Sequence, residues 1–282
     1  MKFHLDTAEI FVPDGLPDKQ ALARTTHLCL AAHQDDIEIL APGPILECYQ
    51  RQDLWFTGVV VTDGRGSPRS GCYADYDDEQ MRCVRFAEQR KAATVGEFAA
   101  QVMLDFPSRV VKGEQRREVV EDIGQILRGT RPRVVYTHNL CDKHDTHVAV
   151  ALRVIEAVRS LPLSERPERL YGGEVWRALD WMDDADKVLQ DTSARENLQA
   201  ALIGVFDSQI AGGKRYDLAA LGRRRANATF FESHGVDRTE GLAYAMDLTP
   251  LLLDEHLDAA VFTKNLVHHF VRDVQDRLSR LM

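Results

Sequence analysis

Two short polar segments hold most of the side chains in this sequence that could do chemistry. Residues 33–36 (HQDD) follow one apolar run, and residues 138–147 (HNLCDKHDTH) follow another. Neutral imidazoles and carboxylates together are typical ligands of a divalent ion such as zinc. A catalytic zinc site usually has three protein ligands and one position left for water, and His33, Asp36 and His147 can supply that set.

The other polar side chains of these segments would then act on a substrate. Asp35 would lie beside the metal-bound water and take its proton as the general base. His144, three residues before His147, would donate to the developing oxyanion or protonate a leaving amine. These groups together are typical of amide or ester hydrolysis. Each segment alone also fits a structural interpretation, because Asp at such a position often caps the following helix.

Hydrophobic periodicity predicts the elements that must bring the two segments together. Short apolar runs predict buried strands at 27–33, 54–62, 101–106 and 133–137, and longer amphipathic stretches predict helices at 36–50, 79–95, 116–127 and 147–160. Strands that alternate with helices predict an α/β fold with a mostly parallel sheet and helices on both faces. If the first and fourth strands are neighbours, both polar segments lie at the carboxyl edge of the sheet and face each other.

The pattern is looser after about residue 160. It predicts a strand at 171–176, helices at 194–207 and 214–231, and a terminal amphipathic helix at 263–281. We interpret residues 1–282 as a single domain, with a core at about 20–160 and a carboxyl-terminal α/β extension at about 161–282. The apolar face of the terminal helix leaves two interpretations open, a homo-oligomer contact or an intrachain contact.

Composition narrows the class of protein. The chain has 282 residues and a net charge of −9, which disfavours binding to nucleic acid. No apolar run approaches the roughly 18 residues that a membrane span needs, and the first thirty residues do not resemble a signal peptide. The five cysteines are an odd number and include no CxxC pair, which disfavours a disulfide framework and favours a reducing compartment. We therefore expect a cytoplasmic protein that acts on a small molecule.

The two polar segments also resemble a known family. AAHQDDIEI (31–39) is similar to the AHPDD-x-E signature of the PIG-L/LmbE family of zinc-dependent N-deacetylases, and HNLCDKHDTH is similar to its second signature. Residues 85–96 resemble the helix after the family's second strand. The resemblance covers roughly residues 26–160 and continues weakly at 207–209 (DSQ).

This resemblance implies a Rossmann-like fold and hydrolysis of an N-acetyl group on an amino sugar or its conjugate. His33, Asp36 and His147 would bind Zn²⁺, or another divalent metal. Asp35 would be the general base, and His144 would stabilise the tetrahedral intermediate. The expected substrate contacts are Arg69, with Arg65 in reserve, and Asp142.

Three positions depart from the family pattern. Gln34 replaces the usual proline, Pro42-Gly43-Pro44 stands where Gly-Gly-Thr is common, and Phe206 stands where a histidine is often found. Two alternatives therefore stay open: an amidase acting on a non-sugar acylamine or thiol conjugate, and a non-catalytic metal- or ligand-binding module. A nucleotide-binding protein is disfavoured because no GxGxxG follows the first strand.

Overall fold

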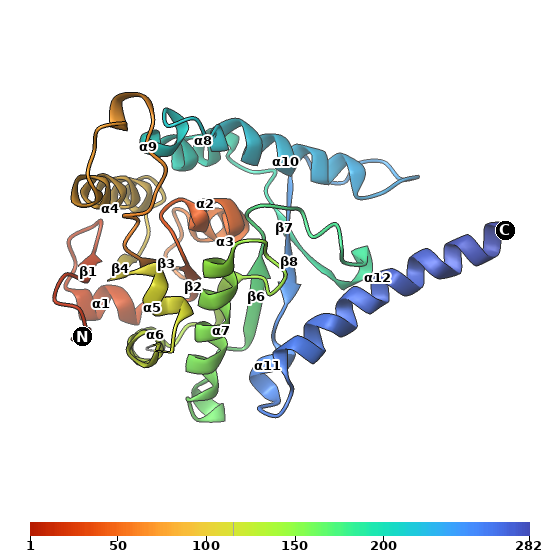
Figure 1. Cartoon of the computed structure of the whole chain (residues 1–282), viewed down its shortest axis with the longest axis horizontal. Helices are drawn as coiled ribbons and strands as arrows, with labels where there is room; N and C mark the ends of the chain where they lie inside the picture. The colour runs from red at the N-terminus through yellow and green to blue at the C-terminus, as the bar shows by residue number, and fades with distance from the viewer. Residues whose placement is uncertain (115) are drawn as a thin grey trace.

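An eight-stranded sheet forms the centre of the computed structural model, which describes residues 1–114 and 116–282 (Figure 1). In spatial order its strands are β1 (Glu9–Phe11), β4 (Ala100–Phe106), β3 (Phe56–Thr62), β2 (His27–Ala31), β5 (Val134–His138), β6 (Arg169–Gly173), β8 (Leu242–Asp247) and β7 (Lys187–Asp191). The strands from β4 to β6 run parallel, whereas β1, β8 and β7 are antiparallel to their neighbours. The predicted α/β class with a mostly parallel sheet is confirmed.

Helices cover both faces of this sheet (Figure 1). Leu28 and Leu30 of β2 belong to the core under α1 (Asp18–Ala23), α6 (Arg117–Thr130), α7 (Asp145–Arg159) and α11 (Pro250–Leu253). Cys29 and Ala31 belong to the core on the other face, under α2 (Asp36–Leu40), α3 (Pro42–Cys48), α4 (Asp78–Val95), α8 (Glu196–Gly204) and α10 (Tyr216–Phe230). Because successive side chains of a strand point to opposite faces, one short apolar run serves both cores. The shorter helices α5 (Ser108–Lys112) and α9 (Asp207–Ile210) flank the carboxyl edge of the sheet.

The first and fourth predicted strands, which are β2 and β5, are neighbours in the sheet, as the site requires. β2 pairs with β5 in parallel, with Cys29 opposite Tyr136. The polar segments that follow these two strands, 33–36 and 138–147, therefore leave the same edge of the sheet side by side.

The predicted helix at 36–50 is wrong as a single element. The structure has two helices there, α2 and α3, which meet at Ala41. Pro42 explains the break, since proline lacks a backbone N–H and disfavours helical geometry in the residue before it. The cluster Pro42-Gly43-Pro44 thus begins a second helix, with proline at its favoured first position.

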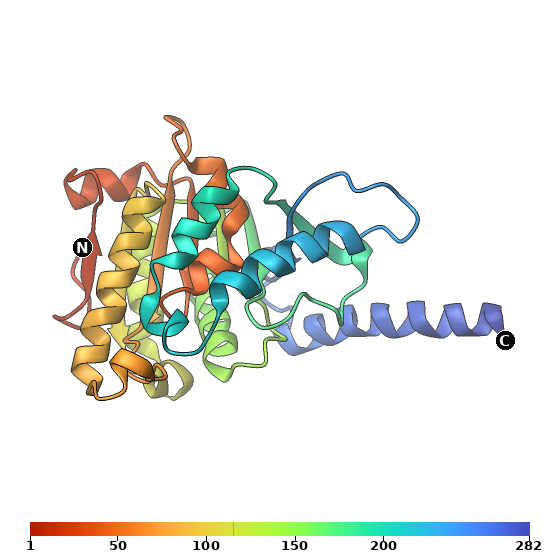
Figure 2. The same ribbon diagram turned by 90° about the horizontal axis from the view of Figure 1, so that it is seen from above.

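The extension contributes strands to the same sheet. β6 begins two residues before the predicted 171–176 strand, and the sequence analysis missed β7 and β8 altogether. The β8 sequence, LAYAMD, has no β-branched residue, so its strand signal is weak. The terminal helix, α12 (Ala259–Leu281), begins four residues before the predicted 263–281 and ends where predicted, and it projects away from the body of the molecule (Figures 1 and 2). In the described part of the chain, no helix combines the length and the apolar character needed to cross a bilayer.

His27, at the start of β2, gives the first testable prediction. Its ring is buried against Tyr136, and burial lowers the pKa of His27 below its ordinary value. Below about pH 6.5 the unfolded chain therefore binds a proton that the folded chain does not, and stability falls by up to about 1.4 kcal/mol per pH unit. His27→Gln should remove this component. Urea unfolding of both proteins should show a constant difference in stability above pH 7 and a shrinking one towards pH 5. Parallel curves over that range would contradict the assignment.

Candidate metal centre and active site

Three donor atoms from the two polar segments meet at the carboxyl edge of the sheet. His33 Nδ1 lies 3.1 Å from Asp36 Oδ2 and 3.2 Å from His147 Nε2, and Asp36 Oδ2 lies 3.3 Å from His147 Nε2. Zinc bonds of about 2.0–2.2 Å in a tetrahedron place neighbouring ligand atoms about 3.3 Å apart. The donor set and its spacing therefore fit one tetrahedral ion.

Local backbone geometry presents Asp36 to this point. β2 ends at Ala31, and Asp36 begins α2, so a tight loop joins the two elements. Asp36 Oδ2 accepts a hydrogen bond from the backbone N–H of His33 at 2.7 Å, which closes the loop. Burial raises the pKa of the Asp36 carboxyl, but His147 and His33 outweigh burial and hold that pKa well below its usual range. Asp36 is therefore a carboxylate anion, which suits a metal ligand.

Asp142 orients His147 from behind. His147 Nδ1 lies 3.0 Å from Asp142 Oδ2, so Nδ1–H donates to the carboxylate and the Nε2 lone pair faces His33 and Asp36. The same carboxylate accepts a hydrogen bond from the backbone N–H of His144 at 2.9 Å. A carboxylate behind a histidine is common at metal sites, because it fixes the ring and its tautomer. Asp142 was expected to contact substrate, but its carboxylate instead accepts hydrogen bonds from His147 Nδ1 and from the backbone N–H of His144.

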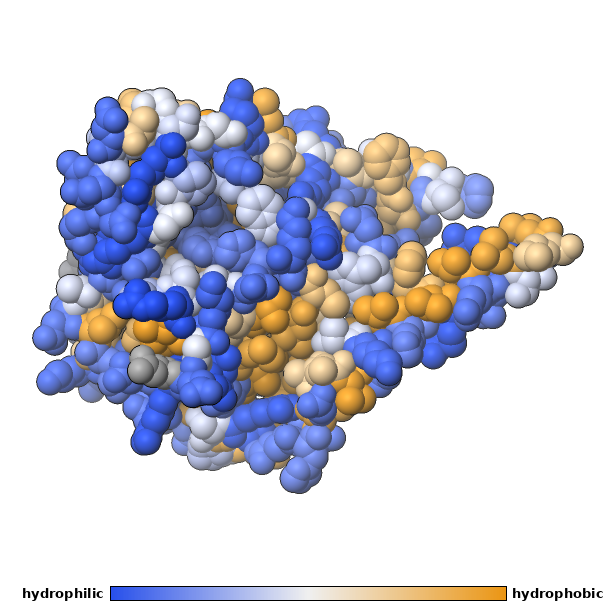
Figure 3. Space-filling model, in the orientation of Figure 1, coloured by the Kyte–Doolittle hydropathy of each residue, from blue (hydrophilic) through white to orange (hydrophobic). Residues whose placement is uncertain are grey.

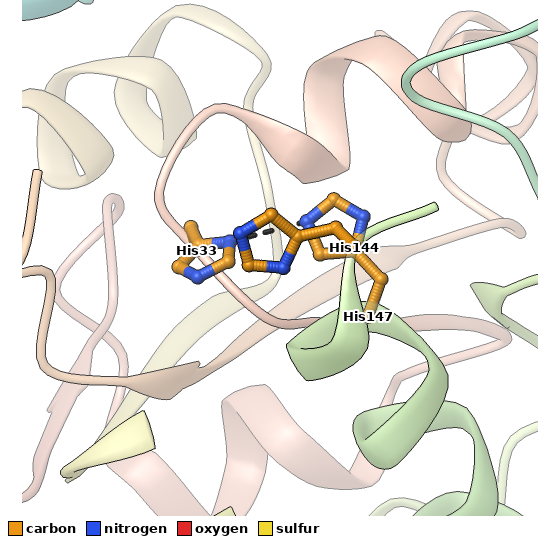
Figure 4. Close-up of side chains that lie close together, drawn as sticks. All are labelled: His33, His144 and His147. Atoms are coloured by element: carbon orange, nitrogen blue, oxygen red, sulfur yellow. Dashed lines mark hydrogen bonds between the residues drawn. The ribbon is translucent and has the colours of Figure 1, made fainter. Parts of the chain in front are cut away.

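The His144 ring lies beside the rings of His33 and His147, with centroids 5.0 and 4.6 Å away (Figure 4). It caps α7, and its Nδ1 accepts a hydrogen bond from the backbone N–H of Thr146 at 3.3 Å. Burial, helped by the nearby His147 and His33, lowers the pKa of His144. A neutral ring that accepts at Nδ1 carries its proton on Nε2, so His144 is a hydrogen-bond donor.

His138 is a buried residue of the site to which the sequence analysis gave no role. The predicted strand stopped at residue 137, whereas β5 includes His138, whose ring stacks on His147 with centroids 3.9 Å apart. Its Nε2 accepts a hydrogen bond from the backbone N–H of Ala32 at 2.8 Å. Because that lone pair is occupied, the alternative ligand set of Asp36, His138 and His147 fits a metal less well.

Asp35 is held in an unusual backbone conformation by Arg85. Its φ of 88° is left-handed, which costs a non-glycine residue about 1–3 kcal/mol. The buried guanidinium of Arg85 donates to Asp35 Oδ2 at 2.9 Å and to the backbone carbonyl of Gln34. Burial raises the pKa of Asp35 to about 6, and the positive charge of Arg85 opposes that rise. Asp35 is thus a fixed carboxylate in the wall of the site.

The extension anchors Arg85 in turn. Arg85 Nη1 donates to Glu88 Oε2 at 3.0 Å, and Ser208 donates to Glu88 through its backbone N–H (2.6 Å) and its hydroxyl (2.8 Å). Phe206 is buried with its ring under the Arg85 guanidinium, 5.6 Å from centroid to Cζ. Ser208, in α9, and Phe206, where the family often has histidine, therefore both help to position Arg85, which in turn holds Asp35.

Gln34, which stands where the family usually has proline, does not separate the ligand atoms of His33, Asp36 and His147. The Gln34 side chain is buried, and its amide donates to the backbone carbonyl of Thr62 at 3.3 Å. This contact ties the loop after β2 to the end of β3, so a side-chain hydrogen bond restrains the segment where the family usually has proline.

A cavity of about 370 Å³ opens onto these groups. Beyond the histidines and carboxylates, its described lining includes Arg85, Lys112, Trp176, Gln209, Lys214 and Tyr216. Arg65 and Arg69, the expected substrate contacts, are not among these described lining residues. Arg65 instead pairs with Asp63 and Glu79, at 3.1 and 2.7 Å, and Arg69 pairs with Asp78. The cationic groups that face the cavity are therefore different from the predicted ones.

Both polar segments of the site lie within a match to a known family model. Residues 28–158 match the model of the PIG-L family, described as GlcNAc-PI de-N-acetylase. No curated protein matches the sequence.

Several solved structures share the fold. The conserved protein TT1542 from Thermus thermophilus is 20% identical, with 83% of this chain and 99% of that chain covered and a TM-score of 0.62. GalB, the 4-carboxy-2-hydroxymuconate hydratase from Pseudomonas putida, is 16% identical, with 79% and 96% covered and a TM-score of 0.62. N,N'-diacetylchitobiose deacetylase from Pyrococcus horikoshii is 19% identical, with 78% and 83% covered and a TM-score of 0.59. One fold thus serves a hydratase and a deacetylase, so the reaction depends on the site and not on the fold alone.

Proposed function

Because residues 28–158 match the model of the PIG-L family, we propose that this chain is a zinc-dependent hydrolase that removes an N-acetyl group from an amino sugar or its conjugate. The observation that carries the proposal is the meeting of His33 Nδ1, Asp36 Oδ2 and His147 Nε2 within 3.3 Å of one another. When bound by these atoms, zinc supplies Lewis acidity, which polarises an acyl carbonyl and lowers the pKa of water.

The residues around that point have distinct tasks in the proposed reaction. Asp35 accepts the proton of the attacking water, while Arg85 keeps the carboxylate aimed and anionic. His144 donates from Nε2 to the oxygen that becomes negative when water adds to the carbonyl carbon. The C–N bond then breaks, and the proton held by Asp35 goes to the leaving amine. The products are acetate and a free amine.

The residues that line the cavity suit a substrate of about the size of a sugar that carries polar groups. Trp176 is part of the lining, and the ammonium groups of Lys143 and Lys214 lie 5.2 and 5.5 Å from its ring centroid. Lys112 and Lys214 are exposed on the same lining. Among the ion pairs of the described residues, none involves either lysine. Both ammonium groups are therefore available to hydroxyl, carboxylate or phosphate oxygens of a substrate.

Replacing either lysine should weaken substrate binding more than turnover. For Lys112→Ala and for Lys214→Ala we expect KM to rise about two- to fivefold with kcat changed less, because an exposed charged contact is worth up to about 1 kcal/mol. Steady-state kinetics on the best substrate will measure this. Lys91→Ala, an exposed lysine on α4, is the matched control. An unchanged KM in both cavity variants would remove these lysines from the substrate site.

The proposed reaction is tested by acetate release. The zinc-loaded protein should free acetate from at least one N-acetylated amino sugar or conjugate, and a chelator should abolish that release. Longer N-acyl sugars and non-sugar acetamides in the same assay separate the sugar deacetylase from the wider amidase alternative. If none of these amides is hydrolysed by protein shown to contain zinc, the proposal is wrong.

A further inference from the structure

The terminal helix α12 stands largely outside the folded body (Figures 1 and 2). It has 23 residues, and none of them is buried. Its first turns contact the core through Phe262 and Leu266. A long helix end without packing is only marginally stable in water, because most helical stability in proteins comes from burying an apolar face. His269 Nδ1 lies 2.8 Å from Asp186 Oδ2, and beyond that contact no side chain of α12 forms a hydrogen bond or ion pair with another element of the described chain.

That outer part carries an ordered apolar stripe. Val267, Val271, Val274, Leu278 and Leu281 follow one another at spacings of four, three, four and three residues. Leu278 is 55% exposed and Leu281 is 80% exposed. A four–three alternation is the pattern of a coiled-coil seam, in which the apolar stripe faces another helix. Figure 3 shows apolar residues running along the projecting helix on the side that faces the end of α10.

A groove accompanies the stripe. A cavity of about 530 Å³ lies between α12 and the end of α10. Its apolar lining includes Phe230, Phe231 and Phe270, and Phe230 is 81% exposed. Four carboxylates (Asp180, Asp183, Asp184 and Asp273) also line it, together with two cations, Lys187 and Arg277, which pair with Asp184 and Asp273. The lining therefore keeps an excess of negative charge. The groove thus offers an aromatic surface with a negative wall.

The charge of α12 complements that wall. The helix carries four basic side chains, Lys264, Arg272, Arg277 and Arg280, against two acidic ones, although the whole chain has a net charge of −9. A basic amphipathic helix beside an acidic aromatic groove is complementary to a second copy of itself. In a two-fold arrangement, each copy presents its helix to the groove of the other.

We propose that this chain forms a two-fold symmetric homodimer in which the α12 helices pair antiparallel along the 267–281 stripe. Val271 then packs against Val274 of the partner subunit, and Leu278 against Val267 of the partner subunit. In that register Arg277, which flanks the seam, lies beside Phe270 of the partner subunit at the acidic groove. The groove contacts supplement the short seam, because two heptads alone make a weak coiled coil.

The oligomeric state of the full-length protein tests the proposal. Sedimentation equilibrium should give twice the chain mass of 31.8 kDa at micromolar concentration. The double variant Val274→Asp, Leu278→Asp places charges in the seam and should give a monomer. Ser279→Asp, on the other side of the same helix, should remain a dimer. Because both apolar side chains are exposed, near-UV circular dichroism of the double variant should match that of the wild type.

Three results would overturn the proposal. One is a wild-type protein that sediments at 31.8 kDa up to high micromolar concentration. Another is a double variant that stays dimeric. The third is a monomeric protein that co-sediments with vesicles of phosphatidylserine and phosphatidylcholine and loses that binding in the double variant, which would assign the stripe to a lipid surface.

Discussion

Asp35→Asn is expected to lower kcat by about two to four orders of magnitude while the protein keeps its metal. The amide has the size of the carboxylate but cannot take a proton from water. Because Asp35 lies one residue from Asp36 yet accepts its hydrogen bond from Arg85, its loss should affect proton transfer and leave the three ligand atoms in place. KM should change little, since the proposed task of Asp35 belongs to the transition state.

Activity, bound zinc and thermal stability need to be measured on the same Asp35→Asn sample. Removing one partner of a buried ion pair costs about 3–5 kcal/mol of stability, so a lower melting temperature is expected as well. Asp145→Asn, an exposed carboxylate at the start of α7, should leave all three quantities unchanged. A variant without zinc would instead make Asp35 a metal ligand, and a fully active one would end its assignment as the base.

His147→Ala is expected to release the metal and with it all measurable hydrolysis. His147 supplies one of three donor atoms and lies between the other two ligands and Asp142, so its removal opens the site on one side. Asp142→Asn should have a smaller effect of the same kind, a loss of about 10- to 100-fold in metal affinity, because it disturbs only the orientation of the ring.

Zinc content after dialysis, measured by elemental analysis, distinguishes the ligand sets. His144→Ala is the informative comparison, since His33, His144 and His147 also lie close enough together to hold an ion. The proposed assignment predicts that His144→Ala keeps its zinc and loses kcat. Equal loss of zinc from both variants would favour the three-histidine set, and full zinc in His147→Ala would contradict both sets.

The buried strands, and the polar residues that follow them, could be predicted from the local sequence pattern. The apolar runs at 27–33 and 133–137 predicted two buried strands, and the alternation of strands and helices predicted their parallel pairing. The polar residues after those strands then had to share one edge of the sheet. With the first and fourth predicted strands as neighbours, as in the common doubly wound order, the sequence predicted that His33, Asp36 and His147 meet, and the structure shows that strand pairing.

What was missed depends on contacts between distant parts of the chain. Arg85 acts on Asp35 from 50 positions away, and Ser208 acts on Glu88 from 120 positions away. Neither pairing leaves a periodic signal in the sequence. Asp142 likewise could not be assigned from spacing, because only the structure shows that its carboxylate meets Nδ1 of His147.

Loop residues were the hardest to assign for a related reason. Arg65 and Arg69 follow the second predicted strand, where substrate contacts are common, but carboxylates on α4 and its neighbours draw both guanidinium groups away from the cavity. Lys112 and Lys214 come from segments that carry no motif, and only the packing of α5 and the loop before α10 brings them to the cavity wall.

Crystals of the zinc-loaded protein, measured at the zinc absorption edge, test the central claim most directly. We expect one anomalous peak, about 2.0–2.2 Å from His33 Nδ1, Asp36 Oδ2 and His147 Nε2. A peak that bonds to His138, His144 or a cysteine in place of any of these atoms, or that lies outside this cluster, would contradict that claim.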